Sequence, residues 1–396
     1  MGKYNCEKCG KEFKQKSHYT THANKKNPCV VDRKLKEMID NAVEAKLSEL
    51  NFEPQHNPQI AELPTSSLPQ PPTSLPPNSL LRPPTSLLQP QAELPPKPIL
   101  KWVGGKTQII DKLISVFPPE INNYREPFLG GGSVLFALLS HVKRGAIKIS
   151  GNIYAYDLNG PLIHVYKNIQ MRHNELYDML QQIIAEFNEC GNGEINRKPA
   201  TIQEAKIAKE NYYYWIRSKY NKLSLDDKQD IIGSAMFIFL NKTCFRGVFR
   251  VGPRGFNVPY GHYNNPEIIN KNHLQEIHDL IQNVIFECSD FMVSVQNVEP
   301  DDFVYLDPPY APETDTSFVG YTENGFNLEQ HNSLFRLIHS LTDTRKKIML
   351  SNADVSLVRE NFTMDKYNTS SILCKRSINS KNPEAKAREV IITNYA

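Results

Sequence analysis

The chain has 396 residues, a formal net charge of +3, and 22% charged and 40% hydrophobic residues. This length allows two or three domains, and a charge so close to neutral does not by itself indicate a nucleic acid or membrane partner. The sequence has no apolar run of about 18 residues and no N-terminal secretory signal, so it predicts a soluble, intracellular protein. Three of its seven cysteines lie within the first 29 residues, and the spacing does not resemble a disulfide framework.

The first residues have the spacing of a small ββα zinc finger, including its two core aromatic positions. We expect a tetrahedral zinc site made by Cys6, Cys9, His22 and Cys29, with His18 as the alternative fourth ligand. The unit carries seven lysines against two glutamates, which favours contact with phosphate. A finger that binds another protein is an equally good interpretation.

The next segments separate this unit from the rest of the chain. Asp32 to Leu50 has an apolar stripe at helical spacing, and 14 of the 28 prolines lie between Pro54 and Pro98. Such a proline-rich segment buries too little apolar surface to fold, so it predicts an extended linker. The predicted boundaries are 1–30 for the finger, 31–53 for the helix, 54–96 for the linker and 97–396 for the main domain.

From residue 97 onward, strand-like and helix-like segments alternate, which predicts an α/β domain with a mainly parallel sheet. A predicted strand feeds Gly130–Gly132 and then a helix, an arrangement that brings backbone close to a ligand. Asp157 ends the next strand, where an acid typically holds the ribose of an adenosine-bearing cofactor. Asp290 and Phe291 follow another strand and suit an adenine ring.

The apolar run 303–306 leads into Asp307-Pro308-Pro309-Tyr310. The acid and the Pro308 carbonyl together accept both hydrogens of a planar amine, because the prolines fix the turn and remove competing donors. Tyr310 offers a ring face on which a purine can stack. This tetrapeptide predicts the catalytic loop.

The segment 241–263 contains four basic side chains, no acidic one and five aromatic rings. The basic residues are Lys242, Arg246, Arg250 and Arg254. We expect a β-hairpin that enters a DNA groove, with arginines reading guanine or phosphate and an aromatic ring wedged between bases. A solubilising surface loop is the alternative, but it would not need so many rings.

These motifs, in this order, resemble the Dam-type DNA adenine-N6 methyltransferases of the alpha group over residues 97–396. The resemblance rests on Lys-Trp-x-Gly-Gly-Lys at 101–106, Phe-x-Gly-Gly-Gly at 128–132, the basic segment and Asp-Pro-Pro-Tyr at 307–310. It implies a Rossmann-like class I fold that binds S-adenosylmethionine, with an inserted DNA target-recognition region at about 175–270. It also implies cofactor contacts from Trp102, Lys106, Phe128, Gly130, Gly132, Asp157, Asp290 and Phe291.

The resemblance places Phe245, Arg246, Val248 and Arg250 where the family wedges into DNA and reads bases. Arg246 departs from the asparagine expected in Dam proper, so a GATC target does not follow. The implied reaction is methyl transfer to adenine N6 in a short duplex sequence, by base flipping and direct in-line displacement. Cytosine-C5 methylation would need a nucleophilic cysteine, usually after proline, and the only Pro-Cys pair, at 28–29, lies in the finger.

Two alternatives of different kinds remain at this point. One is methylation of RNA adenine or of a protein glutamine, and the other is a catalytically inactive DNA-binding protein. We further expect a monomer or weak dimer, no membrane partner, and a cognate restriction endonuclease as a system partner that is not a subunit. The expected compartment is a cytoplasmic site of a large DNA virus, or a nucleus or nucleoid.

Overall fold

The computed structural model describes residues 4–5, 12–13, 15–23, 94–312, 326–375 and 386–396. The chain divides into two compact units, Met1–Leu87 and Leu88–Ala396. The helix predicted at 31–53 and most of the proline-rich linker lie outside the described residues. Among the described residues, no helix has the length and apolar character needed to cross a lipid bilayer.

The described residues of the first unit form two short strands and a helix. Strand β1 (Tyr4–Asn5) pairs antiparallel with β2 (Glu12–Phe13), and α1 (Lys16–Ala23) follows. The rings of Tyr4 and Tyr19 stack with their centroids 6.2 Å apart, which joins the first strand to the helix. The backbone of this unit thus follows the predicted ββα order.

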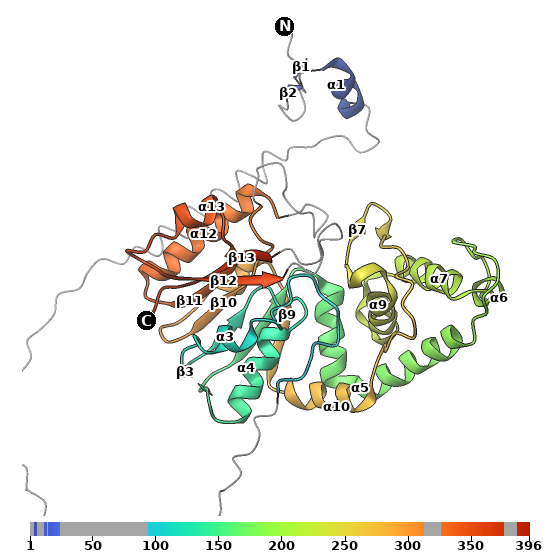
Figure 1. Ribbon diagram of the computed structural model, residues 1–396, viewed down its shortest axis with the longest axis horizontal. Helices are drawn as coiled ribbons and strands as arrows, with labels where there is room; N and C mark the ends of the chain where they lie inside the picture. The colour runs from blue at the N-terminus through green and yellow to red at the C-terminus, as the bar shows by residue number, and fades with distance from the viewer. Residues whose placement is uncertain (1–3, 6–11, 14, 24–93, 313–325, 376–385) are drawn as a thin grey trace, which may run out of the picture. The chain divides into compact units, whose positions relative to one another are not determined.

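The second unit is built on a seven-stranded sheet in the order β12-β13-β11-β10-β4-β6-β9 (Figure 1). The strands are β4 (Tyr124–Glu126), β6 (Ile153–Asp157), β9 (Val284–Cys288), β10 (Phe303–Leu306), β11 (Lys347–Ala353), β12 (Asn368–Lys375) and β13 (Lys386–Thr393). Strands β9, β6, β4, β10 and β11 pair in parallel, whereas β13 is antiparallel to both β11 and β12. A second small parallel pair joins β3 (Glu120–Ile121) to β5 (Lys148–Ile149).

Strand β10 lies in the middle of the sheet and is buried on both faces. All four of its residues are completely buried, and they alternate between two cores. Phe303 and Tyr305 belong to the larger core, while Val304 and Leu306 belong to a second core that includes residues of α12 and α13. A strand buried on both faces reads as the continuous apolar run seen in the sequence.

Helices cover both faces of the sheet (Figure 1). The described helices of this unit outside residues 160–256 are α3 (Ile110–Ile114), α4 (Ser133–Lys143), α10 (Lys271–Leu280), α11 (Phe291–Ser294), α12 (Leu328–Asp343) and α13 (Ser356–Asn361). Helix α12 begins with a capping box, in which Asn327 and Gln330 satisfy each other's backbone N–H groups.

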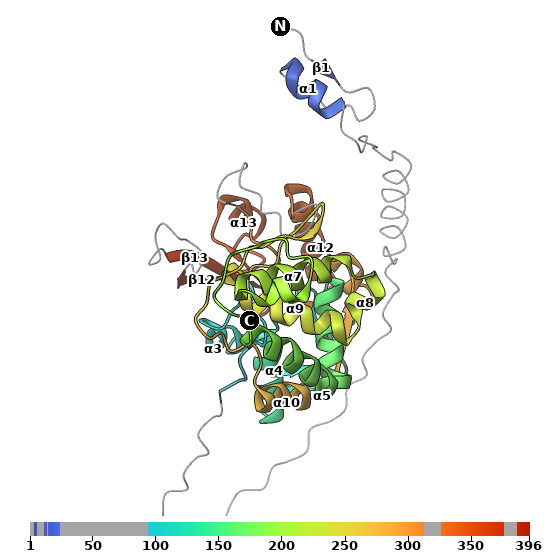
Figure 2. The same ribbon diagram turned by 90° about the vertical axis from the view of Figure 1, so that its right-hand side faces the viewer.

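A largely helical region lies between β6 and β9 in the chain. It contains α5 (Gly160–Asn188), α6 (Ile202–Lys206), α7 (Lys209–Lys222), α8 (Leu225–Gln229), α9 (Ile231–Thr243), the 3-10 turn η1 (Phe245–Gly247), β7 (Val251–Gly252) and β8 (Gly255–Phe256). Helices α7, α8 and α9 face the viewer in Figure 2. This region stands beside the sheet, as Figure 1 shows.

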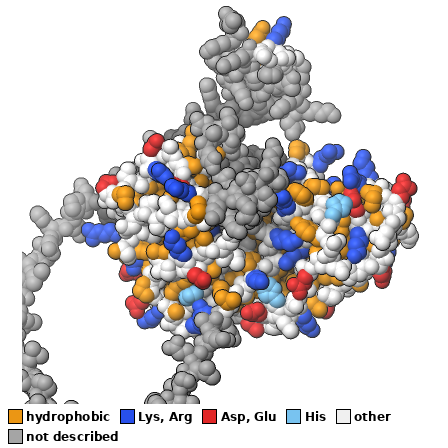
Figure 3. Space-filling view, viewed as in Figure 1, with side chains coloured by type: hydrophobic (Ala, Val, Ile, Leu, Met, Phe, Trp, Pro, Cys, Tyr) orange, Lys and Arg blue, Asp and Glu red, His pale blue; other side chains and the backbone are white. Residues whose placement is uncertain are grey.

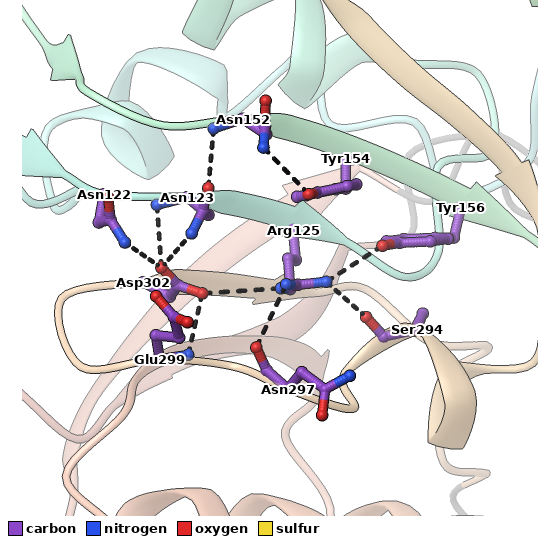
Figure 4. A network of polar contacts seen from close by, with 10 residues as sticks. All are labelled: Asn122, Asn123, Arg125, Asn152, Tyr154, Tyr156, Ser294, Asn297, Glu299 and Asp302. Carbon is purple, nitrogen blue, oxygen red and sulfur yellow. Dashed lines mark hydrogen bonds and ion pairs between the residues drawn. The ribbon is translucent and has the colours of Figure 1, made fainter.

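A polar network fastens the amino ends of β4 and β10 (Figure 4). Asp302 Oδ1 accepts hydrogen bonds from the side-chain amides of Asn122 and Asn123 at 2.9 and 2.8 Å and from the Asn123 N–H at 3.0 Å. Its Oδ2 lies 3.8 Å from Arg125 Nε, and the Arg125 guanidinium stacks on the Tyr154 ring at 4.5 Å. The network joins the two strands at their amino ends, and this holds their carboxyl ends in register.

Candidate active site

The predicted acids lie along one edge of the sheet. Strands β10, β4, β6 and β9 are neighbours in that order, and each is followed at its carboxyl end by one predicted element. These elements are Asp307, the glycine turn 130–132, Asp157 and Asp290. The carboxyl edge of a parallel sheet is where open α/β folds bind ligands, so the fold brings the predicted residues to a suitable place.

Asp307 is the most distinctive of these acids. Its Oδ2 forms an ion pair with Lys106 Nζ at 2.7 Å, whereas its buried Oδ1 has no hydrogen-bond partner among the described residues. Burial raises the pKa of Asp307 to about 6, although the Lys106 ammonium opposes this rise. A buried acceptor that is left unpaired costs free energy, and such atoms concentrate at functional positions.

The loop after Asp307 is held on two sides. The Tyr310 hydroxyl donates to Glu389 Oε2 at 2.8 Å, and Lys106 Nζ lies 4.8 Å from the centre of the Tyr310 ring. Asn352 Oδ1, at the end of β11, accepts from the Ala311 N–H at 3.0 Å. The two prolines therefore lie in a turn whose far end is fixed to the sheet.

The glycine turn is covered by Trp102. A side chain on Gly130 would meet the Trp102 ring at 2.7 Å, and one on Gly131 would meet Trp102 Cβ at 2.9 Å. Gly130 and Gly132 both have positive φ, which favours glycine, and Gly132 faces the core at Tyr166 and Phe136. The indole of Trp102 thus lies directly on the turn.

Asp157 fixes the same turn from the neighbouring strand. Its two carboxylate oxygens accept the N–H groups of Gly130 at 3.0 Å and Asn159 at 2.9 Å. Burial raises the pKa of Asp157, and these two hydrogen bonds oppose the rise. Each oxygen retains a further acceptor position, so a ribose hydroxyl is chemically compatible with the carboxylate.

Asp290 and Phe291 border an aromatic cluster. The Asp290 side chain caps α11 by accepting the Met292 N–H at 2.8 Å. Phe128 stacks on Phe291 at 5.7 Å, and both rings contact Phe326. The cluster supplies an apolar surface beside an acid, which suits a purine ring.

The basic segment differs from the predicted hairpin. Residues 241–243 are the last residues of helix α9, which extends the apolar stretch 231–240. The 3-10 turn η1 follows. Strands β7 and β8 form a short hairpin, with Val251 opposite Phe256, and Cys244 and Tyr260 also pair antiparallel. Lys242 therefore lies in the last helical turn, half-buried, and burial lowers its pKa. The hairpin prediction was wrong for residues 241–243, which are helical, and for the 3-10 turn η1, whereas the antiparallel pairing of Cys244 with Tyr260 agrees with it.

The remaining basic-segment residues differ in exposure. Phe245 is 48% exposed, and the Arg246 guanidinium lies 5.3 Å from its ring. Val248 is half-buried, whereas Arg254 is exposed at the turn between β7 and β8. Arg250 Nε donates to Asn257 Oδ1 at 2.7 Å. An exposed phenylalanine flanked by arginines presents both an apolar ring and positive charge to the outside.

Comparison with known proteins decides the family. Residues 102–377 match the family of D12 class N6 adenine-specific DNA methyltransferases. The chain belongs to this family. It is 36% identical to the type II methyltransferase M.MjaIII of Methanocaldococcus jannaschii over 309 residues, which cover 76% of this chain and 99% of that protein. It is 30% and 29% identical to the DNA adenine methylases of Haemophilus influenzae and Escherichia coli, covering 76% and 75% of this chain and 94% of each relative.

The mixed α/β architecture with a central, mostly parallel sheet is consistent with a class I methyltransferase. The sequence analysis missed two carboxylates that lie at the candidate site. Glu126 ends β4 and is 2% exposed, and its Oε2 accepts from the Tyr124 hydroxyl at 2.8 Å. Burial raises the pKa of Glu126 to about 8, and the charge of Asp307 adds to the rise.

Glu389, which holds Tyr310, comes from β13. Glu126 had a sequence signal, because it directly precedes Pro127 and the glycine turn at a strand end. Glu389 had none, because only the pairing of β11 with β13 brings it to the site.

The expected zinc ligands cannot be placed. Cys6, Cys9, Cys29 and the side chains of His18 and His22 lie outside the described residues. Within the ranges that the structure describes, no group of three or more His, Cys, Asp or Glu side chains is arranged to hold a metal ion.

Proposed function

We propose that this protein transfers a methyl group from S-adenosylmethionine to N6 of adenine in a short, specific duplex DNA sequence. The observation that carries the proposal is the buried, unpaired Oδ1 of Asp307 at the end of β10. An exocyclic amine offers two N–H donors. Asp307 accepts one of them, and the carbonyl of Pro308, next in the chain, accepts the other.

The chain's own residues then prepare the amine for attack. The nitrogen lone pair of adenine is delocalised into the ring, so the amine is a poor nucleophile until its two hydrogens are held. Two fixed acceptors pull the nitrogen toward tetrahedral geometry and direct the lone pair out of the ring plane. When bound, S-adenosylmethionine supplies an electrophilic methyl group on a positively charged sulfur. Catalysis rests on positioning and on local electrostatics.

Tyr310 receives the target base. The adenine must leave the duplex stack to reach Asp307, and the face of an aromatic ring compensates for the lost stacking. The hydrogen bond to Glu389 fixes the direction of the Tyr310 side chain, because its hydroxyl is anchored at 2.8 Å. The ring is therefore pre-organised before DNA arrives.

The residues along the sheet edge fit the cofactor. Besides Asp307 Oδ1, Asn352 Nδ2 is a buried donor without a hydrogen-bond partner among the described residues. The methionine part of the cofactor carries a carboxylate and an ammonium group. The Lys106 ammonium would attract the first, and the nearby carboxylates would attract the second. Asp157 would hold the ribose, and Asp290 with Phe291 would hold the adenine. Trp102, Phe128, Gly130 and Gly132 complete the proposed cofactor site.

The DNA-binding surface is proposed to centre on Phe245, which would wedge between bases while Arg246, Val248 and Arg250 read them. A cleft of about 430 Å³ in the helical region supports this assignment. It is lined by Arg197, Lys198, Arg217, Lys222 and Arg254, with no acidic residue. Figure 3 shows several Lys and Arg side chains on this half of the molecule. Lys242 and the cleft residues would contact backbone phosphates.

The N-terminal unit is proposed to be a zinc finger. Its support is the antiparallel β1–β2 pair, the helix α1 and the Tyr4–Tyr19 stack, which together have the ββα layout of such fingers. Zinc analysis of the purified chain tests this, and a Cys6→Ala, Cys9→Ala variant is the control. One zinc ion per wild-type chain and none in the variant are expected.

The setting of the enzyme stays a prediction. We infer a restriction–modification role with a separate cognate endonuclease, a monomer or weak dimer, and a site of action where DNA is accessible. Protection of DNA from a co-expressed candidate endonuclease tests the restriction–modification role. Sedimentation analysis tests the oligomeric state.

The direct test is single-molecule modification sequencing of DNA from cells that express the protein, beside an Asp307→Ala control. One short motif carrying N6-methyladenine only with the active protein is the expected result. Unmodified DNA from cells that contain soluble, cofactor-binding protein would contradict a DNA substrate and would favour RNA or protein.

A further inference from the structure

Asn241 connects two segments that lie far apart in the sequence. Its side-chain Oδ1 accepts the Lys101 N–H at 2.8 Å, and its Nδ2 donates to the Lys101 carbonyl at 2.8 Å and to the Gly247 carbonyl at 3.1 Å. The residue is 3% exposed, near the end of α9. Both side-chain N–H donors are thus used, so the amide is committed to this junction.

The two segments touch closely at this junction. We call residues 101–106 the cofactor segment and residues 244–250 the recognition loop. Gly247 has φ +64, and a side chain there would meet Lys101 Cβ at 2.2 Å. Lys101 Nζ also donates to the Lys242 carbonyl at 3.3 Å and lies 3.8 Å above the Tyr263 ring. No gap separates the loop from the cofactor segment at Lys101.

Trp102 extends the contact to the cofactor side. Its ring stacks on Phe249 of the recognition loop at 5.9 Å and on Phe237 of α9 at 6.5 Å. The same indole lies against Gly130, so it lies between the glycine turn and the loop. A single ring thus contacts both the glycine turn and Phe249.

From this arrangement we propose that Asn241 is a positioning residue that joins the recognition loop to the cofactor segment, so that cofactor binding orders the loop that meets DNA. The inference rests on the proposed cofactor site, and it adds a linkage between two sites. Without Asn241, the hydrogen bonds that join Gly247 to Lys101 are lost, and the remaining packing against Lys101 and Trp102 does not hold the loop in place. Linkage requires that cognate DNA in turn strengthens cofactor binding by the same factor.

Hydrogen–deuterium exchange of the full chain, with and without saturating sinefungin (an unreactive S-adenosylmethionine analogue), tests the proposal without DNA. In the wild type, we expect slower exchange both in peptides covering 128–133 and in those covering the recognition loop. A slowing of about fivefold in the loop corresponds to the lower end of typical couplings between sites. In Asn241→Ala, peptides 128–133 should still be slowed, while loop exchange should no longer respond to sinefungin.

Asn211→Ala is a matched control. Asn211 is fully buried, and like Asn241 it accepts one backbone N–H, from Asn196, and donates to two carbonyls, of Glu194 and Glu204. Its loss should cost similar stability but leave the loop response intact, which separates positioning from general destabilisation.

The coupling would be overturned by a loop that responds equally in Asn241→Ala, by a wild-type loop that does not respond, or by loss of the response in Asn211→Ala. If sinefungin slowed neither segment in the wild type, the proposed cofactor site itself would fail. If sinefungin slowed exchange at 128–133 but the protein did not methylate DNA, the proposed DNA substrate would be wrong. The exchange of the recognition loop would then still decide the coupling.

Discussion

Lys106 and Asp307 lie on different segments of the chain, and their side chains form a 2.7 Å ion pair at the carboxyl edge of the sheet. Lys106 Nζ also donates to the Gly104 carbonyl at 2.7 Å, which fixes the ammonium in the turn of its own segment. This arrangement engages one oxygen of Asp307 and leaves the other without a hydrogen-bond partner among the described residues. Lys106 therefore controls both the charge and the orientation of the proposed amine acceptor.

The ion pair predicts the acid limb of the pH–rate profile. Asp307 accepts an amine hydrogen best as the carboxylate, and burial raises its pKa to about 6. The single-turnover methylation rate should therefore fall about tenfold per pH unit below this value. In Lys106→Gln the loss of the positive charge should move the limb to higher pH, besides lowering the rate. An acid limb that stays in place in the variant would contradict the pairing.

Asp307→Ala should reduce methyl transfer by about a thousandfold or more, because it removes an oriented acceptor from a buried site. DNA affinity should stay within about threefold of wild type, since Asp307 is not part of the basic surface. Single-turnover rates and DNA binding measured on the same preparation check this. A rate near that of the wild type would remove Asp307 from the mechanism.

Glu126 should make the protein less stable as pH rises. Burial raises its pKa to about 8, so between about pH 4.5 and pH 8 the folded state binds more protons than the unfolded state. Its stabilising contribution is complete below about pH 4.5 and is lost as pH passes 8, with a slope approaching about 1.4 kcal/mol per pH unit. Glu126→Gln should remove this slope in cofactor-free urea unfolding. Glu120→Gln, at an 80% exposed side chain, should leave it unchanged.

Asp302→Ala should destabilise the fold by about 3 kcal/mol or more, because Arg125 and the two asparagines would lose a buried partner. The matched change is Asp301→Asn, next in the chain, whose side chain is 77% exposed and lies 3.4 Å from Lys347. That substitution should alter stability by less than about 1 kcal/mol. Chemical denaturation measures both, and equal effects would refute a special role for the network in Figure 4.

Arg250 and Lys222 should separate base reading from phosphate contact. Arg250→Ala should reduce discrimination between the methylated motif and single-base variants by about 1–3 kcal/mol at one position. Lys222→Ala should instead weaken all duplexes similarly and reduce the salt dependence of binding by about one unit. Binding titrations at several salt concentrations distinguish the two. An Arg250 variant that changed only the salt dependence would be a phosphate contact.

Local patterns were sufficient to locate the sheet edge. The apolar run 303–306 and the acids at 157 and 290 mark strand ends, because strand length and burial are written in short stretches of sequence. The basic segment 241–263 was harder to predict. Its glycines and aromatics suggested a hairpin, yet the apolar stretch of α9 continues as helix through Thr243.

The sequence alone determined the order of the motifs, the acid at each strand end, and the family they resemble, since each depends on residues that are close in the chain. Tertiary structure decided which groups meet. It brought Glu389 to Tyr310 through an antiparallel strand, Lys106 to Asp307 across the sheet edge, and Asn241 to Lys101 across the helical region. Contacts between such distant residues depend on how strands and helices pack, and no local spacing encodes that packing.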